Sequence, residues 1–174
     1  MSGKAIKSIK DLELVKANYN KKLGKYKYQI LICSGAGCIS CGCKDIRDAV
    51  VDEISKNKLE KDICVYETGC MGTCAIGPVM MILPERIYYT NLTSDTAREI
   101  IKSHCLGGRV LTEYTFYDHS RGKHVPKTDN IDFFKKQVKI ALRNCGLIEY
   151  GNVDSYIAKD GYLAAAKVLT GKTG

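Results

Sequence analysis

The sequence predicts an α/β fold with one small sheet and helices packed against it, and two observations support this class. Between residues 27 and 106, strand-like and helix-like hydrophobic periods follow one another in the order β-α-β-β-β-α. Two glycine-rich loops that contain cysteines directly follow the first two predicted strands. A strand, a crossover helix and a second strand make a right-handed parallel unit, to which the later strands add as hairpin neighbours.

The strands of this unit are short apolar or alternating runs bounded by turn residues. They are predicted at residues 27–33, 62–67, 78–83 and 86–90. Apolar side chains at helical spacing predict two helices, at residues 43–58 and 93–106. Thr93 or Ser94 can cap the second helix, and Gly107 and Gly108 end it. The resulting layer of about 80 residues is small for an independent core.

Further helices are predicted on both sides of the α/β unit. An apolar stripe predicts an amphipathic helix over residues 8–22. Residues 109–129 look irregular, and we interpret them as a linker because long structureless loops are uncommon inside compact domains. Apolar faces then predict helices at residues 130–145, 153–159 and 162–169. The predicted organisation is a basic N-terminal helix, an α/β domain, a linker and a C-terminal helical segment, at residues 1–25, 26–108, 109–129 and 130–174.

The composition excludes several classes of protein. Hydrophobic residues make up 45% of the 174 residues and charged residues 26%, which is ordinary for a globular chain and unlike a disordered one. The longest apolar run has five residues, whereas a membrane-spanning helix needs roughly 20. The charged N-terminus lacks the apolar stretch of a secretory signal. We therefore expect a cytoplasmic protein without a transmembrane segment.

The net charge of +8 is unevenly distributed along the chain. Residues 1–28 contain eight lysines and two acidic residues, and residues 108–174 are also basic, whereas residues 29–107 are slightly acidic. No basic motif interleaved with aromatic residues is present, so we do not expect nucleic-acid binding. The N-terminal lysines fit either a solvated helix face or a surface that docks on an acidic partner subunit.

The nine cysteines carry the chemical information in this sequence. Seven of them lie between positions 33 and 74. In a reducing compartment, such a cluster of thiols indicates a metal or iron–sulfur site more often than disulfides. The first loop has the spacing C-x4-C and the second C-x3-C, and parallel strands would bring both loops to one sheet edge. The predicted ligands are Cys33, Cys38, Cys70 and Cys74, the four thiolates that a [2Fe–2S] cluster requires.

Other interpretations of these cysteines stay open. Cys33, Cys38 and Cys41 also match a C-x4-C-x2-C run, in which Cys41 would replace Cys74 as a ligand. A structural zinc ion takes four cysteines as well, and the chain would then be an interaction module without redox activity. A redox dithiol of Cys38 and Cys41 is a third interpretation. Cys64, Cys105 and Cys145 are predicted to be small core residues.

Two stretches of the sequence resemble known families. ICSGAGC at 32–38 and TGCMGTCAIGP at 68–78 resemble the thioredoxin-like [2Fe–2S] ferredoxins. The resemblance implies a thioredoxin-like ferredoxin domain whose cluster ligands are Cys33, Cys38, Cys70 and Cys74. Cys41 and Cys43 are not part of the family pattern. Pro78 would occupy the position of the cis-proline of thioredoxin-like folds, although a trans-proline can also begin a strand.

The second resemblance concerns residues 133–169. They are similar to the segment that opens the flavin-bearing, NADH-oxidising subunit of bacterial complex I, NAD-reducing hydrogenases and electron-bifurcating iron hydrogenases. This implies electron transfer within an NAD(P)H-linked complex whose other iron–sulfur and flavin subunits are the partners. FMN and NAD(P)H would bind in a remainder of the subunit that this sequence does not contain. No set of residues suggests a catalytic site within the 174 residues.

Overall fold

The computed structural model describes residues 5–171 and contains a four-stranded mixed sheet in the order β2-β1-β3-β4. Strand β1 pairs with β2 in parallel and with β3 antiparallel, and β4 is the hairpin partner of β3. The parallel β1–β2 unit and the β3–β4 hairpin were predicted, whereas the pairing of β3 with β1 was not. The strands are Tyr28–Cys33 (β1), Ile63–Thr68 (β2), Met80–Leu83 (β3) and Ile87–Tyr89 (β4).

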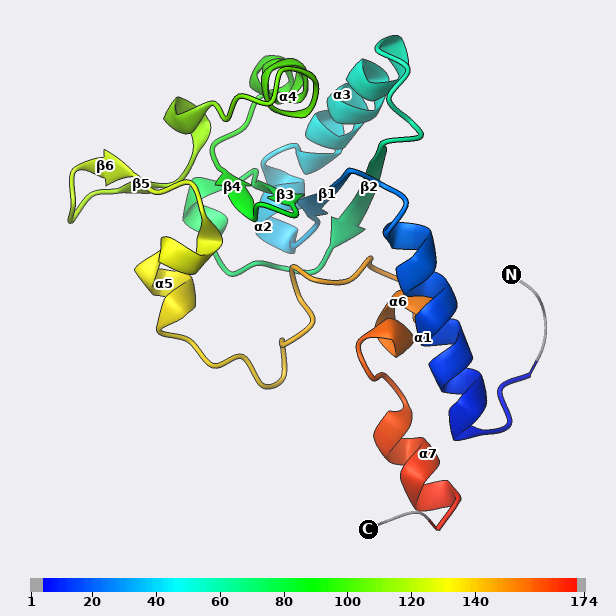
Figure 1. The fold of residues 1–174 in the computed structure, drawn as a ribbon. Helices are drawn as coiled ribbons and strands as arrows, with labels where there is room; N and C mark the ends of the chain where they lie inside the picture. The colour runs from blue at the N-terminus through cyan, green and yellow to red at the C-terminus, as the bar shows by residue number, and fades with distance from the viewer. Residues whose placement is uncertain (1–4, 172–174) are drawn as a thin grey trace.

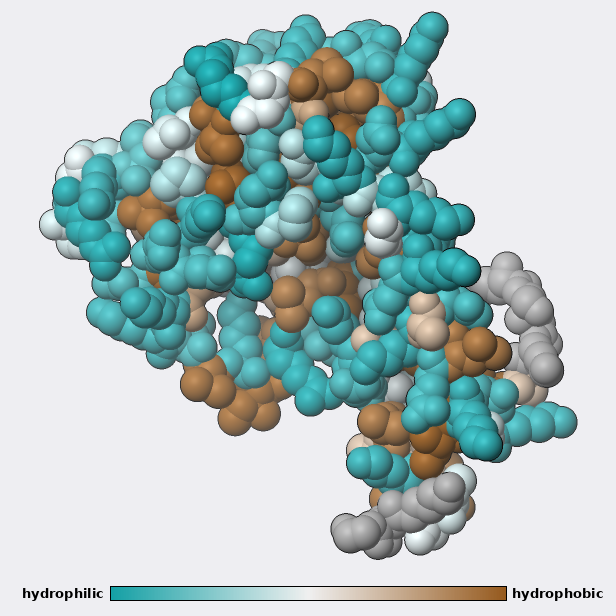
Figure 2. Space-filling model, viewed as in Figure 1, coloured by the Kyte–Doolittle hydropathy of each residue, from teal (hydrophilic) through white to brown (hydrophobic). Residues whose placement is uncertain are grey.

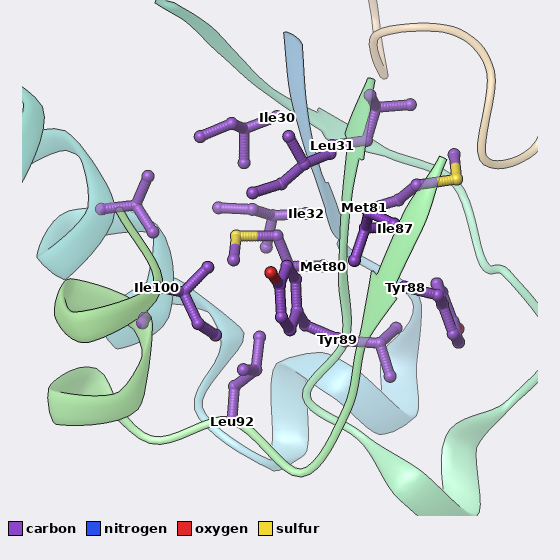
Figure 3. Packing of buried hydrophobic residues seen from close by; sticks show 14 of the residues in the cluster. Ile30, Leu31, Ile32, Met80, Met81, Ile87, Tyr88, Tyr89, Leu92 and Ile100 are labelled. Atoms are coloured by element: carbon purple, nitrogen blue, oxygen red, sulfur yellow. The ribbon is translucent and has the colours of Figure 1, made fainter. Parts of the chain in front are cut away.

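Two helices cover one face of the sheet (Figure 1). Helix α3 (Cys43–Lys56) is the crossover between β1 and β2, and α4 (Ser94–Ile100) continues into a π-helical turn (Ile101–Leu106). Thr93 caps α4 through a capping box with Thr96, as the sequence predicted. In Figure 3 the side chains of Ile32 on β1 and Met80 on β3 point toward Ile100 of α4, whereas that of Met81 points to the opposite face of the sheet. This layer forms the main hydrophobic core.

Residues 109–131, which include the stretch 109–129 that we interpreted as a linker, pack against the sheet, and this corrects that interpretation. They run along the outer edge of β4, where Tyr88 N–H donates to Pro126 O and Thr90 N–H donates to Tyr114 O. Within this stretch lie a two-stranded hairpin and two 3₁₀ turns, at Tyr117–Asp118 (β5), Lys123–His124 (β6), Thr112–Tyr114 and Thr128–Asn130. Leu111, Val125 and Ile131 belong to the main core. The pattern looked irregular because the segment is held by single bridges rather than by long strands.

The N-terminal helix and the C-terminal helices pack on one another beside the sheet (Figure 1). Helix α1 (Ile9–Leu23) is capped by Ser8, whose side chain accepts a hydrogen bond from Asp11 N–H. It contacts α6 (Val153–Ala158) and α7 (Leu163–Leu169), close to the ranges expected for them. Residues 1–4 and 172–174, the ends of the predicted N-terminal and C-terminal segments, lie outside the described residues.

Two local predictions are wrong. The helix expected over residues 130–145 shrinks to α5 (Asp132–Lys135), and the chain then continues through turns. The middle of its predicted apolar face lies in solvent, since Val138 is 90% and Leu142 59% exposed, whereas Phe134 packs against the core. The first cysteine loop, in turn, contains a short helix, α2 (Ala36–Ser40). None of the helices over residues 5–171 combines the length and the apolar character needed to cross a bilayer.

Candidate metal centre

The two cysteine loops leave the sheet at the same edge. Strands β1 and β2 are parallel neighbours, and the last pair in their register is Cys33 with Thr68. Ser34 N–H donates to Thr68 O at 2.9 Å, so the first residues of both loops are still held side by side. The first loop then turns into α2, and the second leads to a 3₁₀ turn at Cys74–Ile76. The parallel pairing therefore brings the predicted ligands together.

The first pair of thiols, Cys33 and Cys38, is buried. Cys33 ends β1, and Cys38 lies in the middle of α2, one turn further along the chain. Burial raises the pKa of the Cys38 thiol to about 12, and a hydrogen bond with Cys33 adds to the shift. These two sulfurs are therefore neighbours, and their surroundings disfavour the thiolate form of Cys38. A bound metal ion would displace the proton of the thiol.

The second pair, Cys70 and Cys74, lies nearer to the surface. The Cys70 sulfur accepts a hydrogen bond from Gly72 N–H at 3.3 Å, across a turn in which Gly72 has a φ of +90°. The pKa of the Cys74 thiol is raised, first by its hydrogen bond with Cys70. Cys74 is exposed at the start of the 3₁₀ turn. Like the first pair, this pair therefore consists of two hydrogen-bonded thiols, but it lies on the solvent side of the site.

Glycines let the two loops approach one another. A Cβ atom at Gly35 would lie 2.9 Å from Cys70 Cβ, and one at Gly37 would lie 3.0 Å from Cys74 Cβ. A Cβ atom at Gly77 would lie 3.1 Å from Cys38 Sγ. Each distance is shorter than an ordinary van der Waals contact, so larger residues would push the sulfurs apart. The peptide bond from Gly77 to Pro78 is cis.

The donor set consists of two thiol pairs. Within residues 5–171, no group of three or more imidazole, thiol or carboxylate side chains is assembled tightly enough for a single metal ion. A [2Fe–2S] cluster does not need such a group, because each of its two irons takes two protein ligands. Cys33 with Cys38 and Cys70 with Cys74 would supply one such pair for each iron. The residues present therefore fit a two-iron cluster.

Apolar side chains lie over the site from the sheet and from the second loop. Met71, between the cysteines of the second pair, is 3% exposed. The Tyr88 hydroxyl is hydrogen-bonded to the Thr73 hydroxyl. Burial raises the pKa of Tyr88, and the nearby thiols of the site raise it further. Tyr88 therefore anchors the second loop while it remains a neutral phenol.

The remaining cysteines are placed differently from one another. Cys41, the alternative ligand, is exposed at the end of α2, and Cys43 is buried at the first turn of α3. Cys64 and Cys105 lie on β2 and in the π-helical turn, and burial raises the pKa of both thiols. Cys145 is a residue that sequence reasoning missed. Its sulfur lies 2.8 Å from the position of a Cβ atom at Gly69, next to Cys70.

Cys145 approaches the site because the chain after α5 folds back onto the second loop. Gly146 N–H donates to Thr68 Oγ1 at 3.0 Å, and Tyr150 N–H donates to Glu67 O at 2.8 Å. A Cβ atom at Gly72 would lie 3.6 Å from the ring of Phe133. Spacing along the chain gives no signal for these contacts, since they join residues about 75 positions apart.

Known ferredoxins are similar to this chain over about half of its length. A [2Fe-2S] ferredoxin from Clostridium pasteurianum is 30% identical over 93 residues, which cover 49% of this chain and 91% of that protein. A [2Fe-2S] ferredoxin from Aquifex aeolicus is 28% identical over 87 residues, or 76% of its length. A different kind of relative, the NADP-reducing hydrogenase subunit HndC of Solidesulfovibrio fructosivorans, is 58% identical over 36 residues, which are 7% of that subunit.

Two further comparisons concern a solved structure and a family model. The crystal structure of the thioredoxin-like [2Fe-2S] ferredoxin from Aquifex aeolicus covers 53% of this chain and 99% of its own, with a TM-score of 0.49 and 20% identity. Residues 17–104, half of the chain, match the family model of these proteins. This match includes the whole four-stranded sheet and both cysteine loops. The chain belongs to the thioredoxin-like [2Fe-2S] ferredoxin family, whose members are electron-transfer domains.

Proposed function

We propose that this chain holds its [2Fe–2S] cluster on Cys33, Cys38, Cys70 and Cys74. We further propose that it transfers electrons as the N-terminal part of an NAD(P)H-linked flavoprotein subunit of a hydrogenase-type complex. The observation that carries the ligand assignment is the presence of two thiol pairs on two loops that glycines bring into contact. This arrangement suits a centre with two irons, each of which takes two protein ligands.

When bound, the cluster supplies one-electron chemistry to the domain. The chain's own residues hold it and control its surroundings. Gly72 N–H points at the Cys70 sulfur, and such hydrogen bonds influence the potential of a centre. Met71 and Tyr88 keep water from one side, whereas Cys74 is exposed. A partner can therefore exchange an electron with the cluster from the side of Cys70 and Cys74, the more exposed pair.

The flavoprotein context rests on a short match to a hydrogenase subunit and on the resemblance of residues 133–169. Thirty-six residues are 58% identical to a subunit whose name describes an NADP-reducing hydrogenase. The stretch that resembles flavoprotein subunits, residues 133–169, folds back onto the second ligand loop. We infer that other iron–sulfur and flavin subunits are the partners, and that FMN and NAD(P)H bind outside these 174 residues. Nine free thiols fit a reducing compartment, and we propose the cytoplasm.

The cluster assignment is tested by purifying the chain anaerobically and measuring its iron, sulfide and zinc contents. We expect about two irons and two sulfides per chain, a coloured EPR-silent oxidised state, and an S = 1/2 signal after reduction with dithionite. One zinc ion without sulfide, in a chain that stays colourless after anaerobic reconstitution, would replace the proposal by a zinc-stabilised module.

The flavoprotein context needs a separate experiment. The protein that contains these residues is tagged in its source cells and isolated anaerobically with its bound subunits, and the preparation is analysed for FMN and for viologen reduction by NADPH and by NADH. We expect stoichiometric FMN and activity with one of the two nucleotides. A chain that carries its cluster but comes without flavin and without activity would limit the function to that of a separate ferredoxin.

A further inference from the structure

We propose that residues 133–148, called the docking segment below, form the surface on which an acidic redox protein docks beside the second ligand loop. The inference rests on the proposed electron-transfer function and deepens it, because it names the side of approach and the charge of the partner. Three observations on the described residues carry it: the position of the segment, its exposed apolar side chains and its charge.

The docking segment lies directly against the loop that contains Cys70 and Cys74. Cys145 approaches Gly69, Gly146 contacts Met71, and Phe133 contacts Gly72. A cavity between the segment and this loop is lined by Cys70, Met71 and Gly72 on one side and by residues 137–142 on the other. A protein bound on the segment would thus be close to the more exposed pair of ligands.

The segment exposes apolar side chains that nothing over residues 5–171 covers. Val138 is 90% exposed, Ile140 83% and Leu142 59%. Figure 2 shows hydrophobic residues gathered at the lower edge of the molecule, where Figure 1 draws the loop between α5 and α6. Exposed apolar side chains that gather in one place and are rimmed by polar ones mark interaction sites rather than ordinary surface.

The charge of the segment specifies the partner. Its sixteen residues contain four cations, Lys135, Lys136, Lys139 and Arg143, and no carboxylate. A second cavity, of about 220 Å³, opens between the segment and the sheet, and its described lining includes Arg86, Lys139 and Arg143 but no acidic residue.

The cations that line this cavity differ in the partners they already have. Arg86 is paired with Asp129 at 2.9 Å, and Arg143 interacts electrostatically with Asp160. Lys139, in contrast, lies over the ring of Phe134 at 5.5 Å, a contact that does not neutralise its charge. A carboxylate of the partner would therefore be bound chiefly by Lys139, with Arg143 as the second cation.

An acidic protein fits this surface better than a second copy of the chain. Two docking segments would bring like charges together, which suppresses association, whereas opposite potentials speed the encounter of redox partners. A small apolar centre with a charged rim is also the kind of interface that short-lived redox complexes use.

The first arm of the test measures binding without electron transfer. Oxidised flavodoxin, an acidic redox protein used as a probe, is titrated calorimetrically into the oxidised chain at low salt. We expect Lys139→Gln/Arg143→Gln to weaken binding about tenfold, the effect of two surface charge pairs. The matched control Lys10→Gln/Lys21→Gln removes the same charge from α1, and its affinity should stay within about twofold of the wild type.

The second arm follows the cluster. The reduced chain passes one electron either to ferricyanide, an anion that becomes ferrocyanide, or to hexaamminecobalt(III), a cation that is reduced to cobalt(II). The variant Lys139→Gln/Arg143→Gln should reduce ferricyanide several-fold more slowly than the wild type does. Its rate with hexaamminecobalt(III) should not be lower than that of the wild type. Equal losses in both double variants, no loss in either, or dimerisation through the segment would each overturn the proposal. A chain without a reducible cluster would instead refute the proposed function, whatever the calorimetry gives.

Discussion

At the residue scale, Cys41 and Cys74 compete for the fourth ligand position. The structure places Cys74 next to Cys70, with a hydrogen bond between the two thiols, and close to Gly37. Cys41 is exposed at the end of α2. We therefore expect Cys74→Ser to lower the iron content from about two per chain to near zero, because one iron loses half of its protein ligands. Iron and sulfide analysis with EPR of the reduced chain measures this.

Cys41→Ser is the matched control for this prediction, since it removes one thiol from the same site region without touching a proposed ligand. It should keep its iron, its sulfide and its EPR signal. The opposite pattern, with iron lost in Cys41→Ser and kept in Cys74→Ser, would assign the C-x4-C-x2-C set to the cluster. Loss in both variants would contradict the proposed ligand set as well.

His104 makes a second prediction at this scale. It is buried between the rings of Tyr28 and Tyr89, and its Nδ1 lies 2.9 Å from the Tyr89 hydroxyl. Burial lowers the pKa of His104, although Glu85 opposes the shift. The unfolded chain takes up a proton near pH 6.5, whereas the folded chain does so only at lower pH. The free energy of unfolding therefore falls as the pH drops from about 7 through 6.5 toward the folded pKa.

Urea unfolding at pH 7.5, 6.5 and 5.5 tests this. His104→Phe should be about 1 kcal/mol less stable at pH 7.5, because the Tyr89 hydroxyl loses its partner. The difference from the wild type should shrink as the pH falls, because the variant has no proton to take up. His119→Gln, a change at an exposed histidine, serves as the control and should keep the wild-type slope. A pH-independent difference for His104→Phe would contradict the assignment.

At the element scale, the strands of the sheet were predicted more accurately from the sequence than the segments that surround the sheet. The strands of the α/β unit and the helices between them were predicted because each buries one face, so that apolar residues recur along the sequence at the strand or the helix period. The helix predicted over residues 130–145 was wrong for the opposite reason, since Val138 and Leu142 in the middle of its apolar face are exposed. The proposed ligands were predicted from loop spacing, whereas Cys145 and Phe133 approach the same loops only through tertiary contacts that no local pattern records.

One hydrogen bond fixes the docking segment to the sheet. Thr68 is fully buried at the end of β2, and its hydroxyl accepts from Gly146 N–H. Thr68→Val keeps the shape but leaves that N–H unpaired, which costs about 1 to 3 kcal/mol. We expect amide hydrogens of residues 145–150 to exchange about tenfold faster or more in this variant. Hydrogen exchange followed by mass spectrometry measures the change.

Thr115→Val is the matched control, because Thr115 is also buried and its hydroxyl is hydrogen-bonded to Thr112 O on the opposite side of the sheet. Thr115→Val should lower the global free energy of unfolding to a similar extent. The amide hydrogens of residues 145–150 should then exchange no faster than this loss of global stability explains. Equal acceleration in both variants would mean that the segment opens only when the whole chain unfolds.

At the scale of the whole molecule, both edges of the sheet are covered by chain outside the α/β unit. Thr68 bridges to Glu149 beside β2, and Tyr89 bridges to Thr115 beside β4. Open edges invite pairing with other chains, so these two stretches complete the domain as well as extend it. The boundary predicted at residue 108 took no account of this covering, because single bridges leave no periodic signal in the sequence.

Truncation tests where the folding unit ends. A chain of residues 1–108 lacks Leu111, Val125 and Ile131, which are all buried in the main core. Burial of each contributes about 1.5 to 3 kcal/mol, so their loss removes much of the total stability of 5 to 15 kcal/mol typical of a domain. We expect residues 1–108 to melt without cooperativity and residues 1–135 to melt cooperatively, as followed by circular dichroism.

The longer fragment also retains the backbone hydrogen bonds that cover β4, such as that from Tyr88 N–H to Pro126 O. Both fragments lack α6 and α7, so the loss of their contacts with α1 affects the two equally. Cooperative melting of both fragments at the same temperature would place the boundary at residue 108 after all, and the stretch up to residue 131 would then be a covering that the ferredoxin domain does not need for its own stability.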